Sequence, residues 1–247
     1  MEKGEVVVVV VPFVAQGHLN QLLHLSRLLS TYNLPVHIVG TTIHNRQAKL
    51  RVHGWNQTTN IYFHDFETPK FESPPPNPNA SSKFPSHLIP SFKASSNIRE
   101  PFAKLLSDIS KIARHVVVVH DYLMSTVVQD VVLYANVEAY AFQCASAFTT
   151  FSYAWEEKGR PILDDKESYM HLTKIPIFED LIPQDFLEFV ISHFGCKKFN
   201  SGNLYDTCKV IEGTYIDFLT KEGICGSTKQ WAMGPFNPVS ISNSENP

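Results

Sequence analysis

The sequence has 247 residues, with 21 basic and 24 acidic side chains, a formal net charge of −3 and a pI near 6.4. A chain of this length forms one large domain or two small ones, and its charge gives no electrostatic reason to bind nucleic acid. The four cysteines have no CxxC spacing and are too few for a disulfide framework. We therefore expect a reduced, cytoplasmic location.

The first predicted element is a buried strand followed by a helix. Residues 6–11 are six consecutive valines, a β-branched run that is typical of a strand covered on both faces. Pro12 ends the strand, Gly17 permits the reversal, and leucines at helical spacing continue to Leu29. A secretory signal peptide is the alternative interpretation, but valine favours a strand and no small-residue cleavage site follows. No run reaches the ~20 apolar residues of a membrane-spanning helix.

Further strand and helix patterns continue the same alternation. Strands are predicted at residues 36–40 and 61–66, with a polar helix up to residue 52 between them, so the chain begins as β-α-β-α-β. Residues 68–90 are rich in Pro, Ser and Asn and predict a loop, either solvated or a flap beside a pocket. Residues 87–113 then have a helical pattern, with a break expected at Pro101.

The second half of the chain repeats strand and helix. A fourth strand at residues 116–120 is followed at once by Asp121. A helix at residues 124–133 is expected to face the sheet with Val127, Val128, Val131 and Val132. The remaining predictions are a strand at 138–143, a helix at 145–157, short helices around Pro176 and Pro183, and final strands at 209–212 and 231–233 flanking a helix at 215–221. The fold class is α/β, a doubly wound, Rossmann-like parallel sheet.

His18 and Asp121 are the candidate reactive residues. They follow strands one and four, which are neighbours in the usual order for this winding, so both side chains are expected in one crevice. Histidine can accept a proton from a hydroxyl near neutral pH, and a carboxylate on its other nitrogen would fix the tautomer. The plainer interpretations are a loop histidine bonded to backbone and an aspartate that caps the next helix.

Other chemistries lack their sequence motifs. There is no GxGxxG and no GxxxxGK[ST], which disfavours a Rossmann dehydrogenase and a P-loop nucleotidase. There is also no HExxH or clustered set of metal ligands. The histidines are scattered, and no metal site is predicted. A glycosidase would need a second carboxylate across from Asp121, and none is evident.

Longer stretches resemble a known family. Six of them agree in order along most of the chain: PFVAQGHLNQLLHLSRLL, FPSHLIPSFKASSNIREP, VVHDYLMSTVVQDV, AFQCASAF, IEGTYIDFLTKEG and WAMGPFNPV. They resemble plant family 1 UDP-glycosyltransferases of the GT-B fold, and within that family the zeatin O-glycosyltransferase group.

The resemblance implies a reaction and a catalytic pair. His18 in AQGH and Asp121 in HDYLMS fall on the family's base and its partner. The implied reaction moves glucose or xylose from UDP-glucose or UDP-xylose, as co-substrate, to a hydroxyl of a zeatin-type cytokinin or another small plant metabolite, with inversion and without a metal or other cofactor.

The resemblance also implies acceptor contacts and a domain plan. Gly17, Ser146, Ala147 and Phe148 are expected near the acceptor, although Ser146 and Ala147 equally fit simple helix capping and an aromatic residue at helical spacing, such as Phe148, is more often part of the core. His87 and Leu88 lie in FPSHLIP and are expected to shape the acceptor pocket.

Residues 1–235 are expected to form the acceptor-binding domain, and residues 236–247 to start an interdomain linker. The family's C-terminal UDP-sugar-binding motif, with a WAPQ start and an HCGWNS core, does not occur in this sequence. We therefore expect negligible transferase activity from this chain alone. A non-catalytic small-molecule-binding module is the alternative function.

Overall fold

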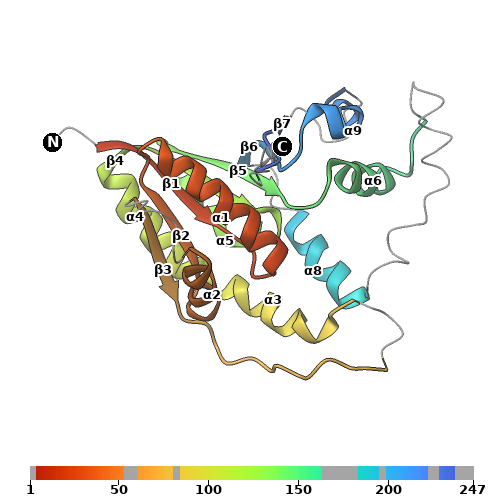
Figure 1. The fold of residues 1–247 in the computed structure, drawn as a ribbon, viewed down its shortest axis with the longest axis horizontal. Helices are drawn as coiled ribbons and strands as arrows, with labels where there is room; N and C mark the ends of the chain where they lie inside the picture. Colours follow the sequence, from red (N-terminus) through yellow and green to blue (C-terminus); the bar gives the residue numbers. More distant parts are fainter. Residues whose placement is uncertain are drawn as a thin grey trace, which may run out of the picture.

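A computed structural model describes residues 4–52, 60–79, 84–162, 183–194, 199–221 and 228–236. The strands are β1 (Gly4–Val11), β2 (Val36–Thr41), β3 (Ile61–Phe66), β4 (Ala113–Asp121), β5 (Val137–Gln143), β6 (Asn200–Tyr205) and β7 (Lys229–Ala232). They form one parallel sheet in the order β3-β2-β1-β4-β5-β6-β7 (Figure 1). The predicted doubly wound α/β fold is confirmed.

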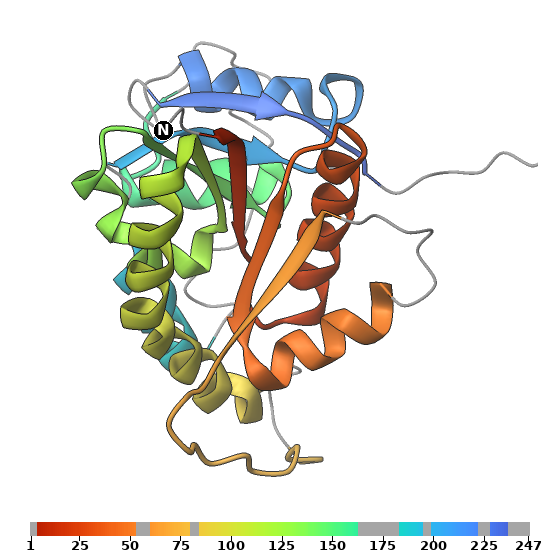
Figure 2. The same ribbon diagram turned by 90° about the vertical axis from the view of Figure 1, so that its left-hand side faces the viewer.

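Helices cover both faces of this sheet. The α-helices are α1 (Gln16–Thr31), α2 (Thr42–Val52), α3 (Ile89–Ser95), α4 (Arg99–Ile112), α5 (Ser125–Val128), α6 (Ala147–Glu157), α8 (Gln184–Phe194) and α9 (Lys209–Lys221). Short 3₁₀ turns are η1 (Ser86–Leu88), η2 (Ser96–Ile98), η3 (Tyr122–Met124) and η4 (Gln129–Leu133). In Figure 2, α1 and α2 lie on one side of the sheet and α3 and α4 on the other.

The valine run of β1 is buried on both faces. Val8 and Val10 pack with the leucines of α1, whereas Val9 and Val11 belong to the cluster formed with α4 and α5. Because side chains alternate along a strand, a centre strand between two helical layers needs apolar residues at every position. The six valines therefore reflect the central place of β1.

The pairing of β1 with β4 positions the candidate site. Val11 lies opposite His120 in a continuous parallel register, so both strands end at the same edge of the sheet. The predicted adjacency of strands one and four is confirmed. His18 follows β1, and Asp121 is the last residue of β4.

Two helix predictions need correction. The helical segment before β4 breaks at η2, between α3 and α4, not at Pro101. Pro101 lies in the first turn of α4, where a missing N–H breaks no intrahelical hydrogen bond. Val132 was expected to face the sheet and is 67% exposed, because η4 tightens the chain after α5 and turns that position outward.

The last strands also differ from expectation. Residues 209–212 are the first turn of α9, not a strand, and the sixth strand is β6, which the sequence did not reveal. Its sequence NSGNLY lacks an apolar run. Gly202 leaves room for an aromatic ring there, since a Cβ would lie 2.0 Å from Cζ3 of Trp231. Residues 163–182, including the predicted helix around Pro176, lie outside the described residues.

Among the described residues, no helix is both long enough and apolar enough to cross a membrane.

Candidate active site

His18 and Asp121 are in direct contact at the carboxyl edge of the sheet. Nδ1 of His18 lies 2.7 Å from Oδ2 of Asp121, although the residues are 103 positions apart in the sequence. The histidine side chain is 30% exposed and the aspartate side chain 1% exposed. The pair therefore has a buried anchor and a ring that reaches the surface.

This contact fixes the histidine tautomer. Nδ1 donates its hydrogen to the carboxylate, so in the neutral ring the lone pair is on Nε2. Among the residues that the structure describes, none hydrogen-bonds to Nε2. The ring therefore presents a free base with a fixed orientation.

Asp121 also caps the turn that follows it. Its second oxygen, Oδ1, accepts a hydrogen bond of 2.9 Å from the backbone N–H of Leu123, at the start of η3. The capping interpretation and the histidine-partner interpretation are thus both correct, each for one oxygen.

The surroundings shift the pKa values of both His18 and Asp121 in favour of their charged forms. Burial lowers the pKa of His18, but the charge and hydrogen bond of Asp121 outweigh it, so this pKa is raised above 6.5. Burial raises the pKa of Asp121, yet the charge of His18 and the donors around the carboxylate leave it below its usual 3.8. Asp121 is consequently an anion at neutral pH.

Cys144 is a third member of this site that the sequence analysis did not single out. It follows β5, and its Sγ lies 3.0 Å from Oδ2 of Asp121. Ligand-type atoms of these three residues lie within 4.8 Å of one another, the one such group among the described residues. The polar hydrogens of His18 and Cys144 already bond to Oδ2, so protons satisfy the carboxylate without an ion.

An aromatic cluster lies beside the histidine. Phe13 meets the ring of His18 edge-on, with centroids 5.3 Å apart. It also contacts Phe92 of α3 at 4.9 Å and Phe189 of α8 at 5.7 Å. The end of β1 and two helices far apart in the sequence therefore form one apolar wall next to the reactive pair.

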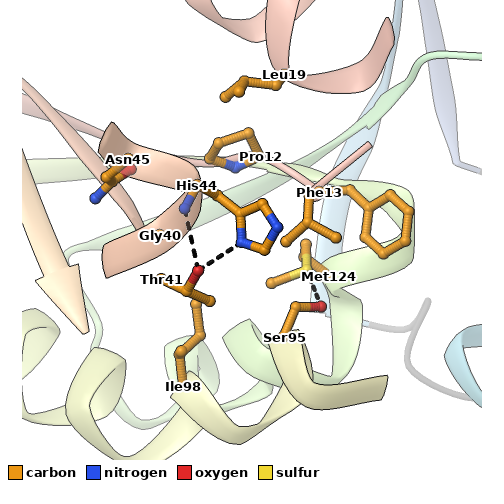
Figure 3. Close-up of a pocket in the computed structure, with 11 residues that line it drawn as sticks. Pro12, Phe13, Leu19, Gly40, Thr41, His44, Asn45, Ser95, Ile98 and Met124 are labelled. Carbon is orange, nitrogen blue, oxygen red and sulfur yellow. Dashed lines mark hydrogen bonds between the residues drawn. The ribbon is translucent and has the colours of Figure 1, made fainter. Parts of the chain in front are cut away.

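A small cavity lined in part by Phe13 lies at the ends of β1 and β2 (Figure 3). Its volume is about 10 Å³, room for about one water molecule. The Thr41 hydroxyl and Nδ1 of His44 hydrogen-bond to each other at its edge. The cavity is too small for a metabolite.

The predicted acceptor residues occupy different surroundings. Gly17 is exposed in the first turn of α1, with open space where a Cβ would be. His87 and Leu88 lie in η1, and Leu88 is 39% exposed. Their role as acceptor contacts stays a prediction.

The start of α6 shows the capping that was the alternative interpretation. Ser146 is the N-cap, and its hydroxyl accepts from the N–H of Thr149 at 3.1 Å. Ala147 has no exposed surface, and Phe148 packs edge-on against Tyr215 with centroids 5.0 Å apart. Acceptor contacts from this helix also stay predictions.

The geometry defines a class of protein: a doubly wound α/β domain in which a partly exposed histidine hydrogen-bonds to a buried carboxylate at the ends of the two central strands. The chain belongs to a glycosyltransferase family, since the family described as "Glycosyltransferase, N-terminal domain" matches residues 4–238.

Curated relatives agree with this family. The chain is 48% identical over 241 residues to a zeatin O-glucosyltransferase of Phaseolus lunatus, covering 98% of this chain and 50% of the relative. It is 46% identical over 244 residues to a zeatin O-xylosyltransferase of Phaseolus vulgaris, covering 99% and 52%. The chain thus spans about half the length of these relatives.

Solved structures share the fold. Phytolacca americana UGT2, complexed with UDP-2fluoro-glucose and pterostilbene, superposes with a TM-score of 0.68 at 14% identity, covering 96% of this chain and 55% of that one.

Proposed function

We propose that this chain is the acceptor-binding part of a UDP-sugar-dependent glycosyltransferase, with a zeatin-type cytokinin hydroxyl as acceptor. One observation carries the proposal: His18 donates Nδ1–H to a buried carboxylate and keeps Nε2 free at the carboxyl edge of the sheet. The names of the two Phaseolus relatives support the acceptor class. They differ in the sugar, so we keep UDP-glucose and UDP-xylose as co-substrates.

The proposed reaction is a direct displacement. The acceptor O–H gives its proton to Nε2 of His18 as the oxygen forms a bond to the anomeric carbon. The bond from that carbon to the UDP oxygen breaks, UDP leaves with the electron pair, and the configuration inverts. Asp121 stabilises the imidazolium that forms at His18. This route needs proton transfer and orientation but no metal or other cofactor.

The burial of Asp121 speaks against a glycosidase. With 1% of its side chain exposed and both oxygens engaged, it is not positioned to face a scissile bond directly. A carboxylate that acts through a histidine fits transfer to a deprotonated hydroxyl better than acid-assisted hydrolysis.

The proposal divides the work between two parts. Residues 1–235 bind the acceptor and supply the base, residues 236–247 begin a linker, and the UDP-sugar is held mainly by a second half of the kind that the relatives contain. We also propose a cytoplasmic location.

Calorimetric titration of the chain with trans-zeatin, cis-zeatin and UDP-glucose tests the binding part. We expect zeatin to bind and UDP-glucose not to bind. Tight UDP-glucose binding would overturn the division of work, and failure of both zeatins to bind would overturn the acceptor class.

A fusion of this chain to the second half of the Phaseolus lunatus enzyme tests the chemistry. His18→Ala should lower kcat by about 10²–10⁴-fold while the chain still binds zeatin. His115→Ala is the matched control, because His115 lies at the opposite end of β4 and is 33% exposed. Unchanged turnover in His18→Ala would overturn the role of His18 as the base, whereas zeatin binding without turnover in the unsubstituted fusion would favour a binding module.

A further inference from the structure

The thiol of Cys144 bonds to the same carboxylate oxygen as the histidine. Sγ lies 3.0 Å from Oδ2 of Asp121, whereas its other nearby acceptor, the carbonyl oxygen of His18, is 3.9 Å away. A thiol has one hydrogen, and the nearer, charged acceptor forms the stronger bond. We therefore take S–H to donate to Oδ2.

The backbone holds this cysteine in position. Cys144 directly follows β5, whose register with β4 pairs Phe142 with Asp121. The carbonyl oxygen of Cys144 accepts a hydrogen bond of 3.3 Å from Nε2 of Gln21 in α1. The backbone of Cys144 is thus held both by the sheet and by the helix that carries His18.

A buried carboxylate is stable only when donors surround it. Within the described part of the chain, Asp121 has three: Nδ1 of His18 and Sγ of Cys144 on Oδ2, and the N–H of Leu123 on Oδ1. The first two compete for one oxygen. The strength of the thiol hydrogen bond therefore limits how strongly that oxygen attracts the histidine proton.

We propose that Cys144 is a positioning residue for the reaction: its thiol holds Oδ2 of Asp121 and moderates the pull of this carboxylate on His18, which sets the basicity of Nε2. The catalytic meaning of this inference rests on the proposed function. The hydrogen-bond arrangement itself does not.

The thiol is suited to remain a donor. Burial raises the pKa of Cys144 well above its usual value, and the charge and hydrogen bond of Asp121 raise it further, with a smaller effect from Asp206. The S–H is therefore present throughout the range in which the histidine titrates. The same shift makes this cysteine a poor nucleophile.

The first test follows the titration of the His18 imidazole by NMR in the full 247-residue chain. Cys144→Val removes the donor at similar volume, so Asp121 should bind the imidazolium more strongly and raise the pKa of His18 by about half a pH unit. Cys144→Ser keeps a donor and should return this pKa toward the wild-type value. An unchanged pKa in Cys144→Val, or equal shifts in both variants, would overturn the proposal.

The second test changes Asp121 and measures the reactivity of Cys144, so it needs no substitution at Cys144. In Asp121→Asn the charge of Asp121 no longer adds to the effect of burial on the thiol pKa, so iodoacetamide should alkylate Cys144 measurably faster than in the wild type at pH 8. Cys208, also a free thiol, is the internal reference and should react at its original rate. Equal alkylation of Cys144 with and without the carboxylate would show that the two groups are not coupled.

These readouts separate two kinds of failure. Neither requires zeatin, a UDP-sugar or turnover, so loss of the proposed function leaves them intact. If Cys144→Val does not fold, the Asp121→Asn alkylation rate decides the question.

Discussion

The carboxylate of Glu212 in α9 accepts a hydrogen bond of 3.1 Å from the backbone N–H of Phe148 in α6. Its second oxygen accepts the N–H of Ala147 at 3.2 Å. One side chain thus caps the helix that begins just after β5, close to the candidate site.

Removal of this cap should loosen α6. We expect Glu212→Ala to lower the free energy of unfolding by about 1–2 kcal/mol, the usual range for a lost N-terminal cap. Glu212→Gln keeps one acceptor and should cost less. Urea unfolding of both variants checks this, and equal losses would mean that the carboxylate does not act as the cap.

Gly202 should tolerate no side chain. A Cβ there would lie 2.0 Å from the indole of Trp231, so Gly202→Ala should destabilise the protein by about 1–3 kcal/mol through overpacking and alter tryptophan fluorescence. Gly17→Ala is the control for stability, because nothing lies within 4 Å of its added Cβ. The prediction fails if both substitutions are equally harmless, and Trp231→Leu should restore part of the loss in Gly202→Ala.

The reaction rate of the fused enzyme should rise with pH. Only the neutral ring of His18 accepts a proton, and its pKa is raised above 6.5, so the rising limb should lie above that pH. Asp121→Asn removes the charge that raises this pKa, which leaves burial to lower it. The limb should move to lower pH while kcat falls by about 10²-fold or more.

An exposed carboxylate is the control for this pH profile. Asp108→Asn alters only a surface pair with Lys111 and should leave the limb in place. A limb that stays fixed in Asp121→Asn would mean that another group sets it.

His193 should make the protein sensitive to acid. It is 1% exposed, and burial lowers its pKa to about 4 from 6.5. Between these values the unfolded chain binds a proton that the folded protein does not, so stability falls as pH drops from 6.5 to 4 and is fully present above 6.5. The difference corresponds to about 3 kcal/mol.

Chemical unfolding between pH 4 and 7 measures this contribution. His193→Gln should reduce the dependence, and His37, whose pKa is also lowered to about 4 by burial and by His64, should keep part of it. The substitution keeps an acceptor for the N–H of Thr126, 3.5 Å from Nδ1 in the wild type. His115→Gln, at a partly exposed position, should keep the wild-type slope. Identical slopes in all three proteins would refute the assignment.

The sequence predicted the parts of the site that local patterns determine. The valines of β1 and β4 mark buried centre strands, and the rule for strand ends then brings His18 to Asp121 without further information. Cys144 follows β5 at the same edge, so the same rule could have found it, but no motif drew attention to a single cysteine.

The missed elements depend on residues distant in the sequence. The strand β6 is polar and is stabilised by its neighbours, including Trp231 over Gly202. Glu212 was assigned to a strand, but it lies in α9 at a residue with non-helical backbone angles, and its capping role depends on α6. Tertiary contacts, which no local pattern encodes, decided both cases.

The pairing of β1 with β4 also bears on how the protein folds. Contacts between residues 103 positions apart carry a large loop-closure entropy, and proteins rich in such contacts fold slowly. The histidine gains its carboxylate only when the two central strands have joined. The raised imidazole pKa should therefore develop during refolding only after β1 and β4 have paired, which makes it a reporter of that long-range step.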